Sequence, residues 1–70
     1  KTNADRLIGM KGKVIKTITQ DVKGEVKIDY QRWTAVSVDN KQINEGEMVV
    51  VKDIVGNKLV VDVIEEIEIK

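Results

Sequence analysis

The side chains that could do chemistry in this chain are few. Its 70 residues include no histidine and no cysteine, which removes the commonest general acid and base, the usual transition-metal ligands and any disulfide framework. Ser37 is the only serine, so a Ser–Lys pair is the one serine-nucleophile arrangement that the composition allows. Carboxylates such as Asp21, Glu25 and Glu45 adjoin predicted turns, where acidic residues are commonly solvated. We therefore expect no enzyme, no cofactor and no metal site.

The only two aromatic residues, Tyr30 and Trp33, stand three positions apart. Exposed rings could stack on a nucleic-acid base or a sugar. A tryptophan beside the small Ala35 could also be a large-against-small pair in a thin core. The neighbouring residues supply no second platform ring and no basic cluster, which favours the core for Trp33. Tyr30 is expected at the rim of the fold, with its ring packed and its hydroxyl in water.

The charges balance overall but not locally. Lys plus Arg and Asp plus Glu each number 12, and zero net charge argues against general polyanion binding, because phosphate neutralisation supplies most non-specific affinity. Residues 1–35 hold eight basic and four acidic side chains. Such a flank could guide nucleic acid or acidic lipid headgroups. Because lysines also form the ordinary solvated side of alternating strands, we interpret these lysines as solvated.

The absence of proline and the abundance of valine and isoleucine predict strands rather than helices. Gly24 is predicted to take a positive φ in the turn before the alternating segment EVKIDY, and Gly56–Asn57 predicts a hairpin turn. The predicted strands cover residues 13–19, 25–30, 32–38, 47–55 and 58–64. Five short strands at this spacing predict a small all-β barrel without a long helix.

We expect one domain over residues 7–64. A flexible lead-in over residues 1–6 precedes it, and residues 65–70 form a tail or a short edge strand. No apolar run is long enough to span a bilayer, and no signal-peptide pattern is present. The chain starts with Lys1 rather than methionine, so we expect an excised domain or a processed terminus.

Five short motifs follow one another along the chain. They are LIGMKGKV (7–14), GEVKID (24–29), RWTAVS (32–37), INEGEMVVV (43–51) and VGNKLVV (55–61). In this order the chain resembles the C-terminal soluble domain of the NfeD family, a five-stranded OB-fold-like Greek-key barrel. The resemblance implies a barrel tethered to membrane-embedded segments outside this chain, and we favour the cytoplasmic side for it. It also implies that the protein functions together with a stomatin- or flotillin-type membrane protein.

The resemblance further implies which side chains face the barrel interior. The implied core residues are Trp33, Ala35, Val26, Ile28, Val49, Val51, Leu59 and Val61. The runs MVVV (48–51) and LVV (59–61) are apolar on both faces of their strands, which exceeds what one core needs. The outward-facing candidates for a partner surface are Met48, Val50, Val60, Val36 and Val38. Either a partner or residues 64–70 of the same chain would cover them.

We therefore expect a non-catalytic protein-interaction module. Its outward valines would contact a stomatin- or flotillin-type protein, the membrane segment of the family, or a second copy of the domain. The alternative is an OB-fold domain that binds single-stranded nucleic acid or an oligosaccharide. Quenching of Trp33 fluorescence by oligonucleotides distinguishes the two.

Overall fold

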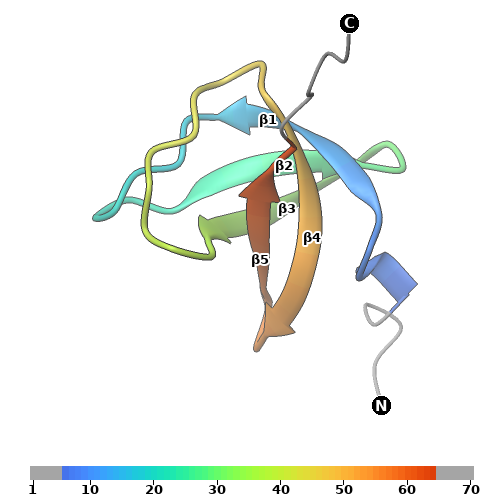
Figure 1. Cartoon of the computed structure of the whole chain (residues 1–70). Helices are drawn as coiled ribbons and strands as arrows, with labels where there is room; N and C mark the ends of the chain where they lie inside the picture. The colour runs from blue at the N-terminus through green and yellow to red at the C-terminus, as the bar shows by residue number, and fades with distance from the viewer. Residues whose placement is uncertain (1–5, 65–70) are drawn as a thin grey trace, which may run out of the picture.

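Five strands close into a barrel in the computed structural model, which describes residues 6–64 (Figure 1). They are β1 (Lys11–Lys16), β2 (Gly24–Ile28), β3 (Gln31–Ser37), β4 (Met48–Val55) and β5 (Lys58–Val63). The strand order is β1-β2-β3-β5-β4, with β4 pairing back onto β1. The β3–β5 pair is parallel and the others are antiparallel. The prediction of a five-stranded all-β barrel without a long helix is confirmed.

The first strand ends earlier than predicted. The β1–β2 register shifts between Val14 and Lys16, and β1 ends at Lys16 rather than continuing to residue 19. Ile18 then pairs with Ile43 in an isolated bridge, with 2.8 Å and 2.9 Å between their backbone nitrogen and oxygen atoms. Both side chains are fully buried, so this bridge anchors the long β3–β4 connection to the core.

Gly24 is not a positive-φ turn residue, contrary to the prediction. It is the first residue of β2, and the glycines with positive φ are elsewhere. A β-carbon at Gly24 would meet the carbonyl oxygens of Lys16 and Thr17 and would lie 2.5 Å from the Ile18 side chain. The glycine is needed because the end of β1 and the two residues after it approach it closely.

The turn between β2 and β3 consists of two residues. Ile28 pairs with Gln31, so Asp29 and Tyr30 form the tip, and β2 ends two residues before the predicted strand end at residue 30. Asp29 has φ 57° and Tyr30 has φ 68°, as a type I′ hairpin turn requires. Arg6 lies 3.6 Å from the Asp29 carboxylate, which ties the N-terminal segment to this tip.

Eleven apolar side chains fill the barrel. The buried cluster comprises Leu7, Val14, Ile18, Val26, Ile28, Ala35, Ile43, Val49, Val51, Leu59 and Val61. Seven of the eight residues assigned to the core are therefore buried. Trp33 is instead partly buried and packs against this cluster. The β3–β5 pairing begins only at Ala35, so Trp33 lies on β3 beyond the end of that pairing.

No helix among residues 6–64 has the length and apolar character needed to cross a membrane. Of the expected lead-in over residues 1–6, residues 1–5 lie outside the described residues, as does the whole tail over residues 65–70.

Candidate partner surface

The five residues predicted to form a partner surface lie on the outer side of the barrel. They alternate with the buried residues of β3, β4 and β5. Met48 and Val38 are 47% and 48% exposed, whereas the other three are half-buried. We call this set the apolar face, and its members are Met48, Val50, Val60, Val36 and Val38.

Pairing between strands brings most of the apolar face together. Val36 is the direct partner of Val60 in the parallel β3–β5 pair. Val50 is the direct partner of Asp62 across β4–β5, which places Val60 diagonally across from Val50 at a distance that side chains can bridge. The parallel β3–β5 pairing cannot be read from the sequence, because it joins strands that are not consecutive in the chain.

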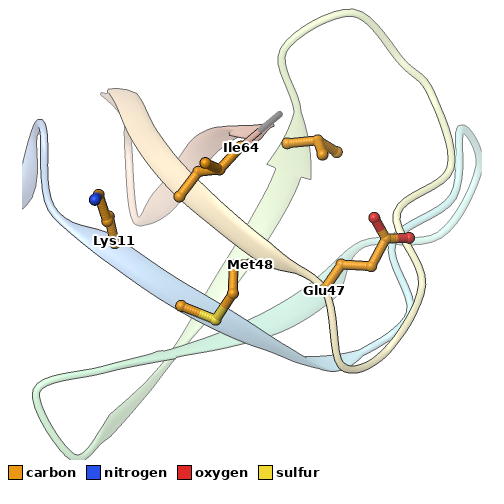
Figure 2. A pocket seen from close by; sticks show the side chains of 5 residues that line it. Lys11, Glu47, Met48 and Ile64 are labelled. Carbon is orange, nitrogen blue, oxygen red and sulfur yellow. The ribbon is translucent and has the colours of Figure 1, made fainter. Parts of the chain in front are cut away.

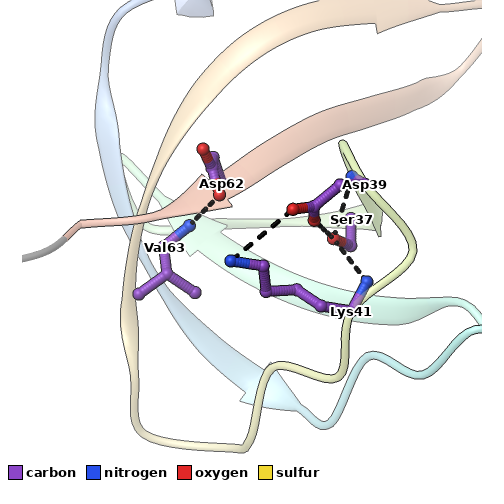
Figure 3. Close-up of polar contacts among 5 residues, drawn as sticks. All are labelled: Ser37, Asp39, Lys41, Asp62 and Val63. Atoms are coloured by element: carbon purple, nitrogen blue, oxygen red, sulfur yellow. Dashed lines mark hydrogen bonds and ion pairs between the residues drawn. The ribbon is translucent and has the colours of Figure 1, made fainter.

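A charged side chain interrupts the apolar face. Asp62 lies directly opposite Val50, and its Oδ1 accepts a hydrogen bond of 2.8 Å from the backbone N–H of Val63 (Figure 3). Lys11 pairs with Val50 from the other side. The apolar face is therefore bordered by basic residues of β1 and carries one acidic residue beside Val50, and protein interfaces commonly combine an apolar centre with a polar rim.

An open depression adjoins Met48 at the start of β4. Lys11, Glu47, Met48, Val63 and Ile64 line it (Figure 2). Of these five residues, only Met48 belongs to the predicted partner surface, and the apolar pair Val63–Ile64 is the sequence signal for two of the others. The depression combines apolar side chains with one positive and one negative charge, so it extends the apolar face rather than forming a separate polar site.

The alternative that the C-terminal residues cover the apolar face stays a prediction. Residues 65–70 lie outside the described residues. At the last described residue, the backbone N–H of Ile64 donates a hydrogen bond of 3.2 Å to the carbonyl oxygen of Met48. The end of β5 is thus held beside the exposed Met48 side chain.

The hydroxyl of Ser37, the only serine, is engaged in hydrogen bonds of the loop that follows β3. The hydroxyl of Ser37 donates to Asp39 Oδ1 at 2.9 Å and accepts the backbone N–H groups of Asp39 at 3.3 Å and of Lys41 at 3.1 Å (Figure 3). Lys41 Nζ lies 3.5 Å from Asp39 Oδ2, so the ammonium pairs with the carboxylate. The pKa of Asp39 is lowered, chiefly by the hydrogen bond from Ser37; desolvation opposes this effect, and the charge of Lys41 lowers the pKa further.

The two aromatic rings do not form a stacking platform. Trp33 packs against the core, and its indole Nε1 is buried with no hydrogen-bond partner among the described residues. Tyr30 is 91% exposed at the hairpin tip, so the prediction that its ring packs at the rim is wrong. A two-residue type I′ turn projects the Tyr30 side chain away from both strands and leaves it no neighbour to pack on.

Comparisons with known proteins agree with this architecture. A family model described as the NfeD-like C-terminal, partner-binding domain matches residues 4–62. The C-terminal domain of a stomatin operon partner protein from Pyrococcus horikoshii is 30% identical, with a TM-score of 0.82, and covers 94% of this chain and 100% of its own. No curated protein matches the chain.

Two further solved structures are similar. The soluble domain of a membrane protein implicated in regulation of membrane protease activity, from Corynebacterium glutamicum, is 32% identical with a TM-score of 0.79, over 84% of this chain and 94% of its own. The soluble domain of the NfeD protein YuaF from Bacillus subtilis is 42% identical with a TM-score of 0.78, over 90% of this chain and 80% of its own. The chain therefore belongs to the family of NfeD-like C-terminal, partner-binding domains, as its motifs predict.

Proposed function

We propose that this chain is the soluble, partner-binding domain of an NfeD-like membrane protein, and that it docks a stomatin- or flotillin-type membrane protein through the apolar face. The family is described as partner-binding, and the relative from Pyrococcus horikoshii is a stomatin operon partner. In this proposal the domain lies on the cytoplasmic side, and segments outside this chain provide the membrane anchor.

The observation that carries the proposal is the exposed apolar character of the outer barrel surface. An outward position of a barrel strand normally holds a polar side chain, because it faces water. Here Val36 and Val60 stand side by side on that surface, and Met48 on β4 is 47% exposed. The core is already filled by inward-facing residues, so folding does not require these apolar side chains.

The chemistry of the apolar face suits a protein partner. An apolar centre with a charged border is the usual composition of a protein–protein interface. Lys11 and Asp62 supply opposite charges beside Val50, which would fix the orientation of a partner more than the affinity. A second copy of the domain could use the same face, and the experiment below includes self-association as an outcome.

A non-catalytic role is supported by the state of Ser37. Its hydroxyl proton is donated to Asp39 and its lone pairs accept two backbone N–H groups. The nearby Lys41 ammonium is paired with the same carboxylate. A carboxylate whose pKa is lowered is a weak general base, so Asp39 is poorly suited to activate the serine. This loop closes the end of β3 and has the features of a structural turn.

The test combines a surface variant with a matched control. The double variant Val50→Lys/Val60→Lys places two charges on the apolar face and should weaken capture of the purified stomatin-type protein of the same organism at least tenfold. Val22→Lys, at a residue that is 60% exposed in the β1–β2 loop, makes the same exchange outside the face and should bind normally. Circular dichroism checks that all variants fold.

Two results would contradict the proposal. Normal capture by the folded double variant would exclude the apolar face as the docking surface. Sedimentation that shows a dimer for the unmodified chain and a monomer for the double variant, with no capture of the stomatin-type protein, would assign the face to self-association.

A further inference from the structure

A row of basic side chains crosses the outer side of β1, β2 and β3. Lys13 is the direct partner of Lys27 in the β1–β2 pair, and Lys27 is the direct partner of Arg32 in the β2–β3 pair. Lys11 lies two residues before Lys13 on the same exposed side of β1. We call Lys11, Lys13, Lys27 and Arg32 the basic row.

The fold alone does not favour this arrangement. Like charges directly opposite each other on neighbouring strands are destabilising, and here three cations occupy successive strands. One ion pair accompanies them: Glu25 lies 4.0 Å from Arg32, whose side chain is 75% exposed. Lys11, Lys13 and Lys27 have no ion pair within residues 6–64. The chain has zero net charge, so the basic row is a local concentration of charge rather than a general excess.

The basic row continues to an exposed aromatic tip. Lys27 and Arg32 are the last cross-strand pair but one before the Asp29–Tyr30 turn. Tyr30 is 91% exposed and holds φ 68°, a conformation that costs energy for any residue with a β-carbon. A bulky side chain kept at a strained, solvated tip indicates a contact outside the domain. Tyrosine is one of the two residues enriched at membrane–water interfaces.

We propose that the basic row and Tyr30 form a docking surface for anionic lipid headgroups. Lysine and arginine would bind the phosphates, and the tyrosine ring would lie at headgroup depth. Lys13 and Lys27 line one open depression together with Val14, Ile15, Glu45 and Gly46, so a phosphate that entered it would lie beside both lysines. The inference rests on the proposed function in one respect, because that function places the domain beside a bilayer.

Lipid fits these observations better than nucleic acid does. Single-stranded nucleic acid is held by bases stacked on several aromatic rings along a basic groove. This chain has two aromatic residues, and Trp33 packs against the core. One exposed ring beside four cations suits headgroups, which need charge and one amphipathic anchor but no series of stacking surfaces.

The test measures binding of the whole chain to vesicles by co-sedimentation. The assay uses vesicles of phosphatidylcholine that contain about 30% phosphatidylglycerol, and the chain should bind them at low salt. Pure phosphatidylcholine should not. Each basic side chain near an anionic surface contributes about fivefold to partitioning. Lys13→Gln/Lys27→Gln should therefore lower binding about 25-fold, and Lys13→Arg/Lys27→Arg should restore it.

A matched variant separates local from general charge. Lys52→Gln/Lys58→Gln removes the same two charges from the β4–β5 hairpin and should leave vesicle binding within about twofold. Tyr30→Gly, which keeps the basic row, should reduce binding several-fold without unfolding the domain.

Three results would overturn the proposal. The first is no binding to anionic vesicles at low salt, and the second is an equal loss of vesicle binding in Lys13→Gln/Lys27→Gln and Lys52→Gln/Lys58→Gln. The third is tighter binding to a single-stranded oligonucleotide than to vesicles. The variant Val50→Lys/Val60→Lys keeps the basic row and should still bind vesicles. Failure of the lipid surface is thus distinguishable from failure of the partner surface, which is scored by capture of a protein.

Discussion

Replacing Tyr30 with glycine is expected to stabilise the domain. Tyr30 has φ 68°, and the left-handed conformation costs a residue with a β-carbon about 1–2 kcal/mol. Glycine adopts it without that cost but loses about 0.5–1 kcal/mol more conformational entropy on folding. The side chain is 91% exposed, so its removal sacrifices almost no packing. The expected net gain is about 0.5–1 kcal/mol.

That gain can be measured by thermal unfolding. For a domain of this size, 1 kcal/mol shifts Tm by about 4–8 °C, so Tyr30→Gly should raise Tm by about 2–8 °C in a scan followed by Trp33 fluorescence or circular dichroism. Gln31→Gly is the matched control, because Gln31 is exposed in β3 and has no positive φ. It should lower Tm. An unchanged or lower Tm for Tyr30→Gly would refute the assignment of strain to this turn.

Three further predictions follow from the core and from the β3–β4 loop. Trp33→Ala should cost about 2–3 kcal/mol in urea unfolding, less than the ~3–5 kcal/mol of a fully buried tryptophan, because the ring is only partly buried; a cost below ~1 kcal/mol would contradict its contact with the core. Gly24→Ala should destabilise the domain by about 2–3 kcal/mol, since the new methyl group meets backbone oxygens of β1 and the following residue, and an unchanged urea midpoint would show that β1 can move away. Asp39 has a folded-state pKa below its ordinary 3.8, so its ionised form stabilises the folded state above that pH, and the contribution is lost as the pH falls through the lowered value. Asp39→Asn should therefore lower Tm at pH 7 and leave it unchanged in acid below that pKa, and an equal loss at both pH values would show that charge is not involved.

Local patterns predicted the parts of the fold that depend on neighbouring residues. The alternation of Val26 and Ile28 with charged residues placed β2 and its buried side correctly, because a strand has a strict period of two. The Gly56–Asn57 pair gave the β4–β5 hairpin, whose strands end and begin at Val55 and Lys58.

Features that depend on distant contacts were not predictable from such patterns. Ile18 leaves β1 because it pairs with Ile43, far along the chain. The role of Gly24 follows from the close approach of residues 16–18, which no local pattern encodes. Tyr30 in a positive-φ turn contradicts local preference, since asparagine and glycine dominate such positions. For the same reason, the alignment of Lys13, Lys27 and Arg32 became visible only with the register of three strands.

The register also relates the apolar face to the basic row. Lys11 is the direct partner of Val50, and Lys13 is the direct partner of Met48, across the β1–β4 pair. Neighbouring strands lie about 4.8 Å apart, so the two surfaces share a border along these strands and do not overlap. A domain resting on lipid headgroups through the basic row would hold the apolar face at its side, next to the bilayer. A membrane protein that projects just above the headgroups would meet that face without displacing the lipid contacts, so both proposed interactions can be made at once.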